Sequence, residues 1–147
     1  MITKLELDEL VEKYENKVFI ETDPIQLPHN YKNVCDIELV GFISALFAYG
    51  SRKVFISKLY ELFSKMGESP IDYIKQGDFS NLSGFNYRFA KENDVIGILE
   101  VLSKLYNSNE TIQTLFKYGY DTTYEIKGML QIVTDYFYAN STDVGEG

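Results

Sequence analysis

The sequence predicts a small all-α domain, and three observations lead to that prediction. The longest apolar run, residues 36–50, places apolar side chains on every face of a helix, which is typical of a helix buried in a core. Start and stop signals for helices recur along the chain. No segment shows the alternation of apolar and polar residues that marks a half-buried strand. We expect a single helical domain over residues 1–140, with about seven helices around the central helix, and a disordered tail over 141–147.

The first helix is predicted from about Lys4 to Asn16. Thr3 and Glu6 have the spacing of a capping box, in which each side chain accepts a hydrogen bond from the backbone N–H of the other residue. Apolar residues then follow at helical spacing, namely Leu7, Leu10, Val11 and Tyr14. The next apolar segment, residues 18–20, is too short to assign.

Residues 23–34 are predicted to be an irregular, extended connector, because they contain two prolines. The central helix follows, and Asp36 is its expected N-cap, because a carboxylate there can accept from the free N–H groups of the first turn. Gly50 is expected in the left-handed conformation that commonly follows the end of a helix. Leu46 is expected to lie buried near the middle of the core.

The remaining helices are predicted from their caps and their apolar stripes. They are expected over residues 52–66, 70–76, 95–106, 110–116 and 123–139. Asp94 is the expected N-cap of the third of these, and Thr122 with Glu125 is expected to form a capping box for the last. We interpret residues 78–93 as an ordered connector held by its aromatic side chains, with room for one turn of helix at 85–90.

Charge and cysteine content limit the class of protein. The formal net charge is −8, which argues against broad electrostatic affinity for nucleic acid or an anionic membrane and leaves room for a local basic patch. The one cysteine rules out an internal disulfide framework and fits a reducing compartment. The N-terminus is amphipathic and acidic, unlike a secretory leader. We therefore expect a cytoplasmic protein that makes no membrane contact.

Several chemistries lack the residues that they require. One histidine and one cysteine cannot make a usual zinc site. The sequence has no glycine-rich phosphate loop, no dinucleotide fingerprint and no serine in a nucleophile elbow. We therefore predict neither a metal nor a cofactor, and we favour a non-catalytic role for this chain.

The turn that joins the two strongest helices is a candidate anion site. Tyr49 precedes a helix start whose free N–H groups and positive dipole end lie next to Arg52 and Lys53, so that a phosphate group fits there. The alternative is an ordinary helix start with two solvated cations. Arg88 lies between two aromatic residues, where stacking on a ring is the favoured role and ligand contact is the other.

The most unusual stretch, DPIQLPHNY, covers residues 23–31. Asp23 and His29 in it are candidates to face a ligand or to act as an acid–base pair. The interpretation that we favour is structural: the two prolines fix a loop over the core, and His29 bonds to backbone.

A resemblance to a known family rests on three stretches: DPIQLPHNY, the segment around FAYGSRK, and LSGFNYRF. Through these stretches the chain resembles the bacterial family filed as domain of unknown function 2400. The resemblance covers about residues 5–137 of this chain and only the N-terminal half of the family's sequences. More distantly, the central helix, turn and second helix look like the start of the helix-hairpin-helix DNA glycosylase fold. The glycosylases commonly end that helix in glutamines, whereas Ala48, Tyr49 and Gly50 stand here, and the region similar to their catalytic aspartate is missing. The resemblance therefore implies no catalysis.

Three functions follow from these observations. The leading one is a non-catalytic module that contacts nucleic acid weakly through residues 49–53 and Arg88. The rival is an interaction or scaffold domain that packs on a missing C-terminal half or forms a homo-oligomer. The third and weakest is an enzyme that uses Asp23 and His29. Cations gathered on one face favour the first, whereas an exposed apolar patch favours the second.

Overall fold

The structure is a computed structural model that describes residues 2–141, and the all-α prediction is confirmed over that range. The α-helices are α1 (Lys4–Tyr14), α2 (Lys17–Thr22), α3 (Val34–Leu46), α4 (Arg52–Met66), α5 (Pro70–Gln76), α6 (Glu92–Asn107), α7 (Ile112–Thr123) and α8 (Ile126–Asn140). Three single turns of 3-10 helix are η1 (Pro24–Gln26), η2 (Pro28–Asn30) and η3 (Ser80–Leu82). The predicted bounds of α4 and α5 agree with those observed.

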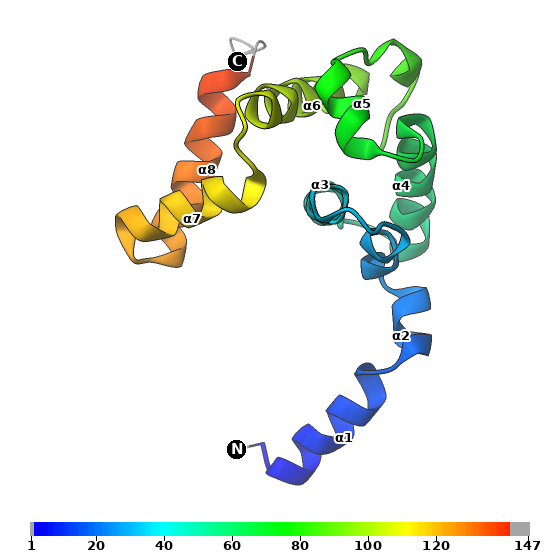
Figure 1. Cartoon of the computed structure of the whole chain (residues 1–147). Coiled ribbons are helices and arrows are strands. Elements are labelled where there is room, and N and C mark those ends of the chain that lie inside the picture. The colour runs from blue at the N-terminus through cyan, green and yellow to red at the C-terminus, as the bar shows by residue number, and fades with distance from the viewer. Residues whose placement is uncertain (1, 142–147) are drawn as a thin grey trace.

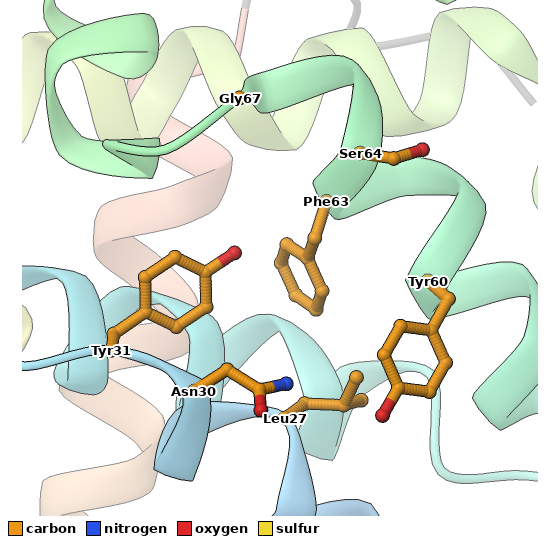
Figure 2. A pocket seen from close by; sticks show the side chains of 7 residues that line it. All are labelled: Leu27, Asn30, Tyr31, Tyr60, Phe63, Ser64 and Gly67. Atoms are coloured by element: carbon orange, nitrogen blue, oxygen red, sulfur yellow. The ribbon is translucent and has the colours of Figure 1, made fainter.

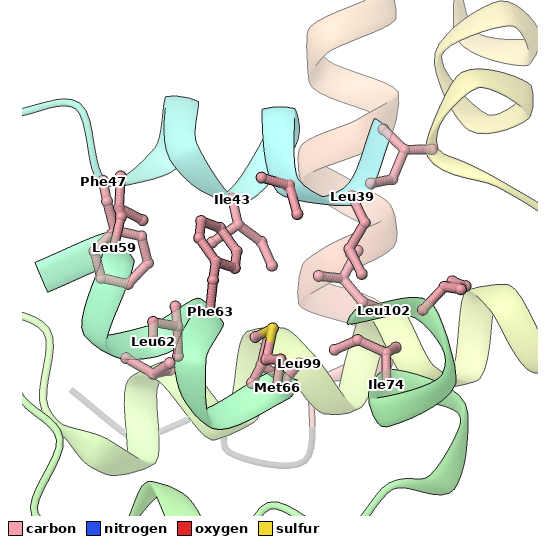
Figure 3. Packing of buried hydrophobic residues seen from close by; sticks show 14 of the residues in the cluster. Leu39, Ile43, Phe47, Leu59, Leu62, Phe63, Met66, Ile74, Leu99 and Leu102 are labelled. Carbon is pink, nitrogen blue, oxygen red and sulfur yellow. The ribbon is translucent and has the colours of Figure 1, made fainter. Parts of the chain in front are cut away.

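Helix α3 is the centre of the fold. Figure 1 shows it end-on, with α4, α5 and α6 around one side and the α7–α8 hairpin on the other, while α1 and α2 extend away. The core lies between α3 and its neighbours α4, α5 and α6, where side chains from all four helices meet (Figure 3). Its fully buried members include Leu39, Ile43, Leu59, Ile74 and Leu102. The prediction that this helix organises the core is therefore confirmed, but it is not buried on every face, since Ile37 is 39% exposed and Leu46 is 42% exposed.

Both ends of the central helix differ from the prediction. Asn33 is the N-cap, and its side-chain oxygen accepts from the backbone N–H of Cys35 at 2.8 Å. Gly50 has a positive φ of 84°, but it lies beyond the helix end at Leu46. Leu46 itself is 42% exposed, so its expected place in the middle of the core is wrong. Leu46 ends the helix and lies on the side of α3 that faces away from α4.

Asp36 caps a different helix from the one expected. Its carboxylate is only 4% exposed and accepts from the backbone N–H of Ile71 at 2.8 Å. That N–H belongs to the first turn of α5, where it has no partner within the helix. The buried carboxylate thus joins α3 to α5, because it satisfies an N–H group that would otherwise be buried without a partner.

Glu38 makes a second link from the first turns of α3. One carboxylate oxygen accepts from the Tyr106 hydroxyl at 2.8 Å, and the other accepts from the backbone N–H of Gln113. Burial of the Tyr106 hydroxyl, together with its hydrogen bond to this carboxylate, strongly raises the pKa of Tyr106. Glu38 therefore holds the end of α6 and the start of α7 against the central helix.

The two connectors are more regular than predicted. Residues 23–34 are not extended, because each proline starts a turn of 3-10 helix, in the first helical position that proline favours. In residues 78–93 the helical turn is η3 rather than 85–90. There, Tyr87 and Ala90 exchange backbone hydrogen bonds of 2.8 and 2.9 Å, which close a tight turn.

The α7–α8 hairpin begins and ends at other residues than predicted. The Thr122 hydroxyl donates to the Tyr118 carbonyl inside α7, and Glu125 is the N-cap of α8, so the predicted capping box is wrong. Helix α7 continues through Gly119 to Thr123, and the missing side chain at Gly119 lets α8 approach closely. A Cβ at Gly119 would lie 3.1 Å from the Cα of Met129. Of the predicted tail, residues 142–147 lie outside the described residues.

Helix α1 forms as predicted but buries none of its residues. The capping box is confirmed, since Glu6 accepts from the Thr3 N–H at 2.7 Å and Thr3 accepts from the Glu6 N–H at 3.3 Å. The apolar stripe of α1 remains uncovered, with exposed fractions of 41–52%. The stripe consists of Leu7, Leu10, Val11 and Tyr14.

Candidate functional site

The predicted anion site is the exposed turn between α3 and α4. Its last residue, Ser51, is the N-cap of α4, but its side chain makes no capping hydrogen bond. The backbone N–H groups of Arg52 and Lys53 therefore have no side-chain cap and no partner inside the helix, whereas the Val54 N–H donates to the Ser51 carbonyl at 3.0 Å. Arg52 and Lys53 are both exposed at this start.

A pair of tyrosines ties this turn to the connector that precedes α6. The Tyr49 hydroxyl donates to the Tyr87 carbonyl at 3.3 Å, and the Tyr87 hydroxyl donates to the Tyr49 carbonyl. Their ring centroids are 5.1 Å apart. Tyr49 therefore has a structural role that sequence reasoning did not assign, because its partner lies 38 positions away in the chain.

Arg88 lies against the same turn. A Cβ on Gly50 would overlap the Arg88 guanidinium and would lie 3.2 Å from the Tyr87 hydroxyl oxygen. The positive φ of 84° favours glycine at position 50, and a side chain there would displace the Arg88 guanidinium from this turn. The guanidinium carbon also lies 5.9 Å from the centre of the exposed Phe89 ring. The structure thus brings Arg88 next to the turn that leads into Arg52.

Asp23 and His29 do not form a pair. The Asp23 carboxylate accepts from the backbone N–H of Ile25 at 3.0 Å and so caps η1. His29 is exposed in η2, and no hydrogen bond joins it to Asp23 within residues 2–141. The same part of the chain holds no group of three or more His, Cys, Asp or Glu side chains that is arranged to hold a metal ion. The pair therefore shows no acid–base geometry, and its proposed ligand contact stays a prediction.

A large apolar groove lies on the side of α3 away from α4. Its volume is about 720 Å³, within the range of sites that hold drug-sized ligands. The groove is formed by α3, α6, α7 and α8, and its apolar lining includes Phe42, Leu46, Val101, Phe116, Leu130 and Phe137. The Phe42 ring lies 6.3 Å from the Phe116 ring and 5.7 Å from the Phe137 ring, so three aromatic side chains meet there.

Two leucines show that the groove is uncovered. Leu46 is 42% exposed and Leu130 is 49% exposed. Polar side chains at Asn93, Asp94 and Thr134 also contribute to its lining. Sequence reasoning missed this groove, because Leu46 and Leu130 have the helical spacing of core residues and only the packing of four helices shows that they face outward.

Comparison with family models gives a match over most of the chain. The family model described as "Protein of unknown function (DUF2400)" matches residues 23–146 of the 147-residue chain. Neither the curated proteins nor the solved structures searched gave a match. The distant similarity to the glycosylase fold and the restriction to half of the family therefore stay predictions. Between residues 2 and 141, the structure has no helix that is both long and apolar enough to cross a membrane.

Proposed function

The chain belongs to the family DUF2400, and on that premise we propose that it is a helical interaction module that pairs with a second copy of itself. In this proposal, α1 of one copy binds in the apolar groove of the other. The uncovered groove of about 720 Å³ is the observation that carries the proposal. Apolar surface of this kind favours association, because its removal from water lowers the free energy.

Helix α1 has the features of a helix that binds in a groove. Its uncovered residues Leu7, Leu10, Val11 and Tyr14 are spaced i, i+3, i+4 and i+7, which is the anchor spacing of that mode of recognition. Its other positions are largely charged, so only one face is suited to burial. The described residues thus include an apolar helix face and an apolar groove that are both largely open, although the Tyr14 ring on that face contacts the Phe19 ring at 5.2 Å between centroids.

The position of α1 favours contact between copies. Figure 1 shows α1 separated from the groove-forming helices α6, α7 and α8 of its own chain. A reciprocal exchange, with α1 of each copy in the groove of the other, closes into a two-fold dimer and leaves neither surface open.

We expect charged substitutions in α1 or in the groove to weaken this association. Leu10→Glu and Leu130→Glu should each raise the dissociation constant about tenfold or more, because each places a charge in an apolar contact. The matched controls are Leu5→Glu and Ile126→Glu, at sites that are both 68% exposed and lie off the stripe and the groove lining. Sedimentation equilibrium at several concentrations measures the effect.

Mixing the two variants distinguishes this arrangement from other self-contacts. Leu10→Glu keeps an intact groove, and Leu130→Glu keeps an intact α1 stripe. An equimolar mixture should therefore recover one of the two contacts and form a heterodimer. A wild-type protein that stays monomeric at every concentration, or a mixture that stays fully dissociated, would contradict the proposal.

A second candidate function is a weak contact with a nucleic-acid backbone at residues 49–53. The observation that favours it is the Arg88 guanidinium against Gly50, since this adds a third cation to a turn that already leads into Arg52 and Lys53. The net charge of −8 opposes long-range attraction, so the affinity should be low and should fall steeply with added salt.

Removing both cations of the α4 start tests this second candidate. Arg52→Ala combined with Lys53→Ala should abolish binding to short DNA at low salt, whereas the control pair Lys17→Ala and Lys127→Ala, also exposed, should not. Fluorescence anisotropy is the measurement. No binding by the wild type, or equal loss in both double variants, would eliminate this candidate.

A further inference from the structure

The DPIQLPHNY stretch forms one wall of a cavity that the proposed dimer does not use. The cavity has a volume of about 220 Å³ and lies between the connector that follows α2 and one face of α4 (Figure 2). Leu27, Asn30 and Tyr31 line it from the connector, and Tyr60 and Phe63 line it from α4. None of these residues lines the apolar groove.

Two polar groups in this lining have no hydrogen-bond partner within the protein. Asn30 is exposed and Tyr31 is half-buried, and among the described residues no protein group bonds to the Asn30 side-chain amide or to the Tyr31 hydroxyl. Figure 2 shows both groups directed toward the side of the cavity where the Phe63 ring lies. Burial and the charge of nearby Asp36 raise the pKa of Tyr31, so its hydroxyl keeps its proton and remains a donor at neutral pH. A donor and an amide that can both donate and accept are thus available to a ligand.

The rest of the lining is apolar or already bonded. Leu27 is 1% exposed and Phe63 is 5% exposed, so together they form a buried apolar wall. The Tyr60 hydroxyl donates to the Gln26 side-chain oxygen at 2.7 Å, which fixes the position of its ring. Among the described residues, no charged side chain lines the cavity. A ligand that matches this lining is therefore neutral, apolar over most of its surface, and polar at one edge.

The volume sets the size of that ligand. A cavity of about 150 Å³ in another protein holds benzene. The present cavity is somewhat larger, so it accommodates one six-membered ring with one small substituent. Figure 2 shows the hydroxyl end of Tyr31 turned toward the Phe63 ring, so a bound ring that packs on Phe63 lies near that hydroxyl.

We propose that this cavity is a binding site for a small, neutral, single-ring aromatic compound that carries an amide or hydroxyl group. The ring packs against Leu27 and Phe63, and the polar substituent bonds to Asn30 and Tyr31. This site gives the two prolines of the DPIQLPHNY stretch a structural role. They start the successive turns η1 and η2, and these turns place Leu27, Asn30 and Tyr31 along one wall of the cavity.

Titration of the full chain with benzamide, followed by protein NMR, tests the site. We expect saturable shifts at roughly millimolar benzamide, confined to amides near residues 26–31 and 60–67, since so small a ligand binds weakly. Benzoate, which carries a charge, and cyclohexanecarboxamide, which has no flat ring, should each bind at least several-fold more weakly.

Two variants separate specific binding from a general effect. Asn30→Leu should weaken benzamide binding about tenfold, because it removes the hydrogen-bonding edge. His29→Leu is the matched control in the same turn and should bind like the wild type, since His29 does not line the cavity. Should Asn30→Leu fail to fold, Tyr31→Phe removes only the hydroxyl and should show a similar loss. Absence of shifts up to about 50 mM benzamide, or equal binding by Asn30→Leu and His29→Leu, would overturn the proposal.

Discussion

Leu39→Ala is expected to lower the free energy of unfolding by about 2–5 kcal/mol. Leu39 is fully buried on α3 and packs in the cluster that joins α3 to its neighbours (Figure 3). Truncation removes apolar contacts and leaves a cavity that the surrounding helices fill only in part. Because α3 is contacted from both sides, this loss weakens the packing of the whole domain. Chemical denaturation of the purified variant measures it.

Leu46→Ala is the matched control for this prediction. The substitution is the same and lies on the same helix, but Leu46 is 42% exposed in the single chain, so at dilutions that keep the protein monomeric we expect a loss of only about 1 kcal/mol. Equal losses in the two variants would show that α3 does not organise the core in the way that Figure 3 indicates.

Asp36→Ala is expected to cost about 2–3 kcal/mol of stability, since a hydrogen bond to a charged group contributes about this much. The carboxylate is buried and accepts from Ile71 at 2.8 Å. Its removal leaves a backbone N–H at the start of α5 without a partner and opens space in the contact between α3 and α5. The thermal midpoint and the denaturant midpoint should both fall, without loss of helical content at low temperature.

Two further variants show whether the hydrogen bond is the cause. Asp36→Asn keeps an acceptor oxygen at the same place, so it should recover part of the loss. Asp72→Ala removes an exposed carboxylate from the first turn of α5 and should change stability by less than about 0.5 kcal/mol. A loss in Asp72→Ala as large as that in Asp36→Ala would point to the general charge of α5 rather than to this buried contact.

Elements with local start and stop signals could be predicted from the sequence. The bounds of α4 follow from Ser51 and Gly67 around an apolar stripe, and those of α5 follow from Pro70 and Gly77. At the start of α3, by contrast, Asn33 and Asp36 both have side chains that favour the N-cap position. Only the contact with Ile71, 35 positions away in the chain, shows why Asp36 lies inside the helix instead.

The same distinction applies to the candidate sites. The exposed cations of the α4 start were identified from sequence, because a helix start and its charged neighbours are local features. The position of Arg88 against Gly50 was not, since it depends on a connector that folds back over 38 residues. The groove depends on four helices, and the small cavity depends on a connector packed against a helix about 30 positions further along the chain, so no local pattern predicts either. The extent of α7 could not be predicted for the same reason. Gly119 lies inside that helix, where its missing side chain allows close packing against Met129 of α8.

The links made by α3 have a consequence for the order in which the chain folds. Asp36 needs only residues up to position 71, whereas Glu38 needs Gln113, which is 75 positions further along. During synthesis, α3 can therefore dock on α5 well before α7 leaves the ribosome. The longer loop between Glu38 and Gln113 costs little more entropy to close than the loop between Asp36 and Ile71, because the cost of closing a loop grows only slowly with its length. We infer that the α3–α5 unit forms first and that the α7–α8 hairpin, whose own contacts are local, adds to it in a separate and later step.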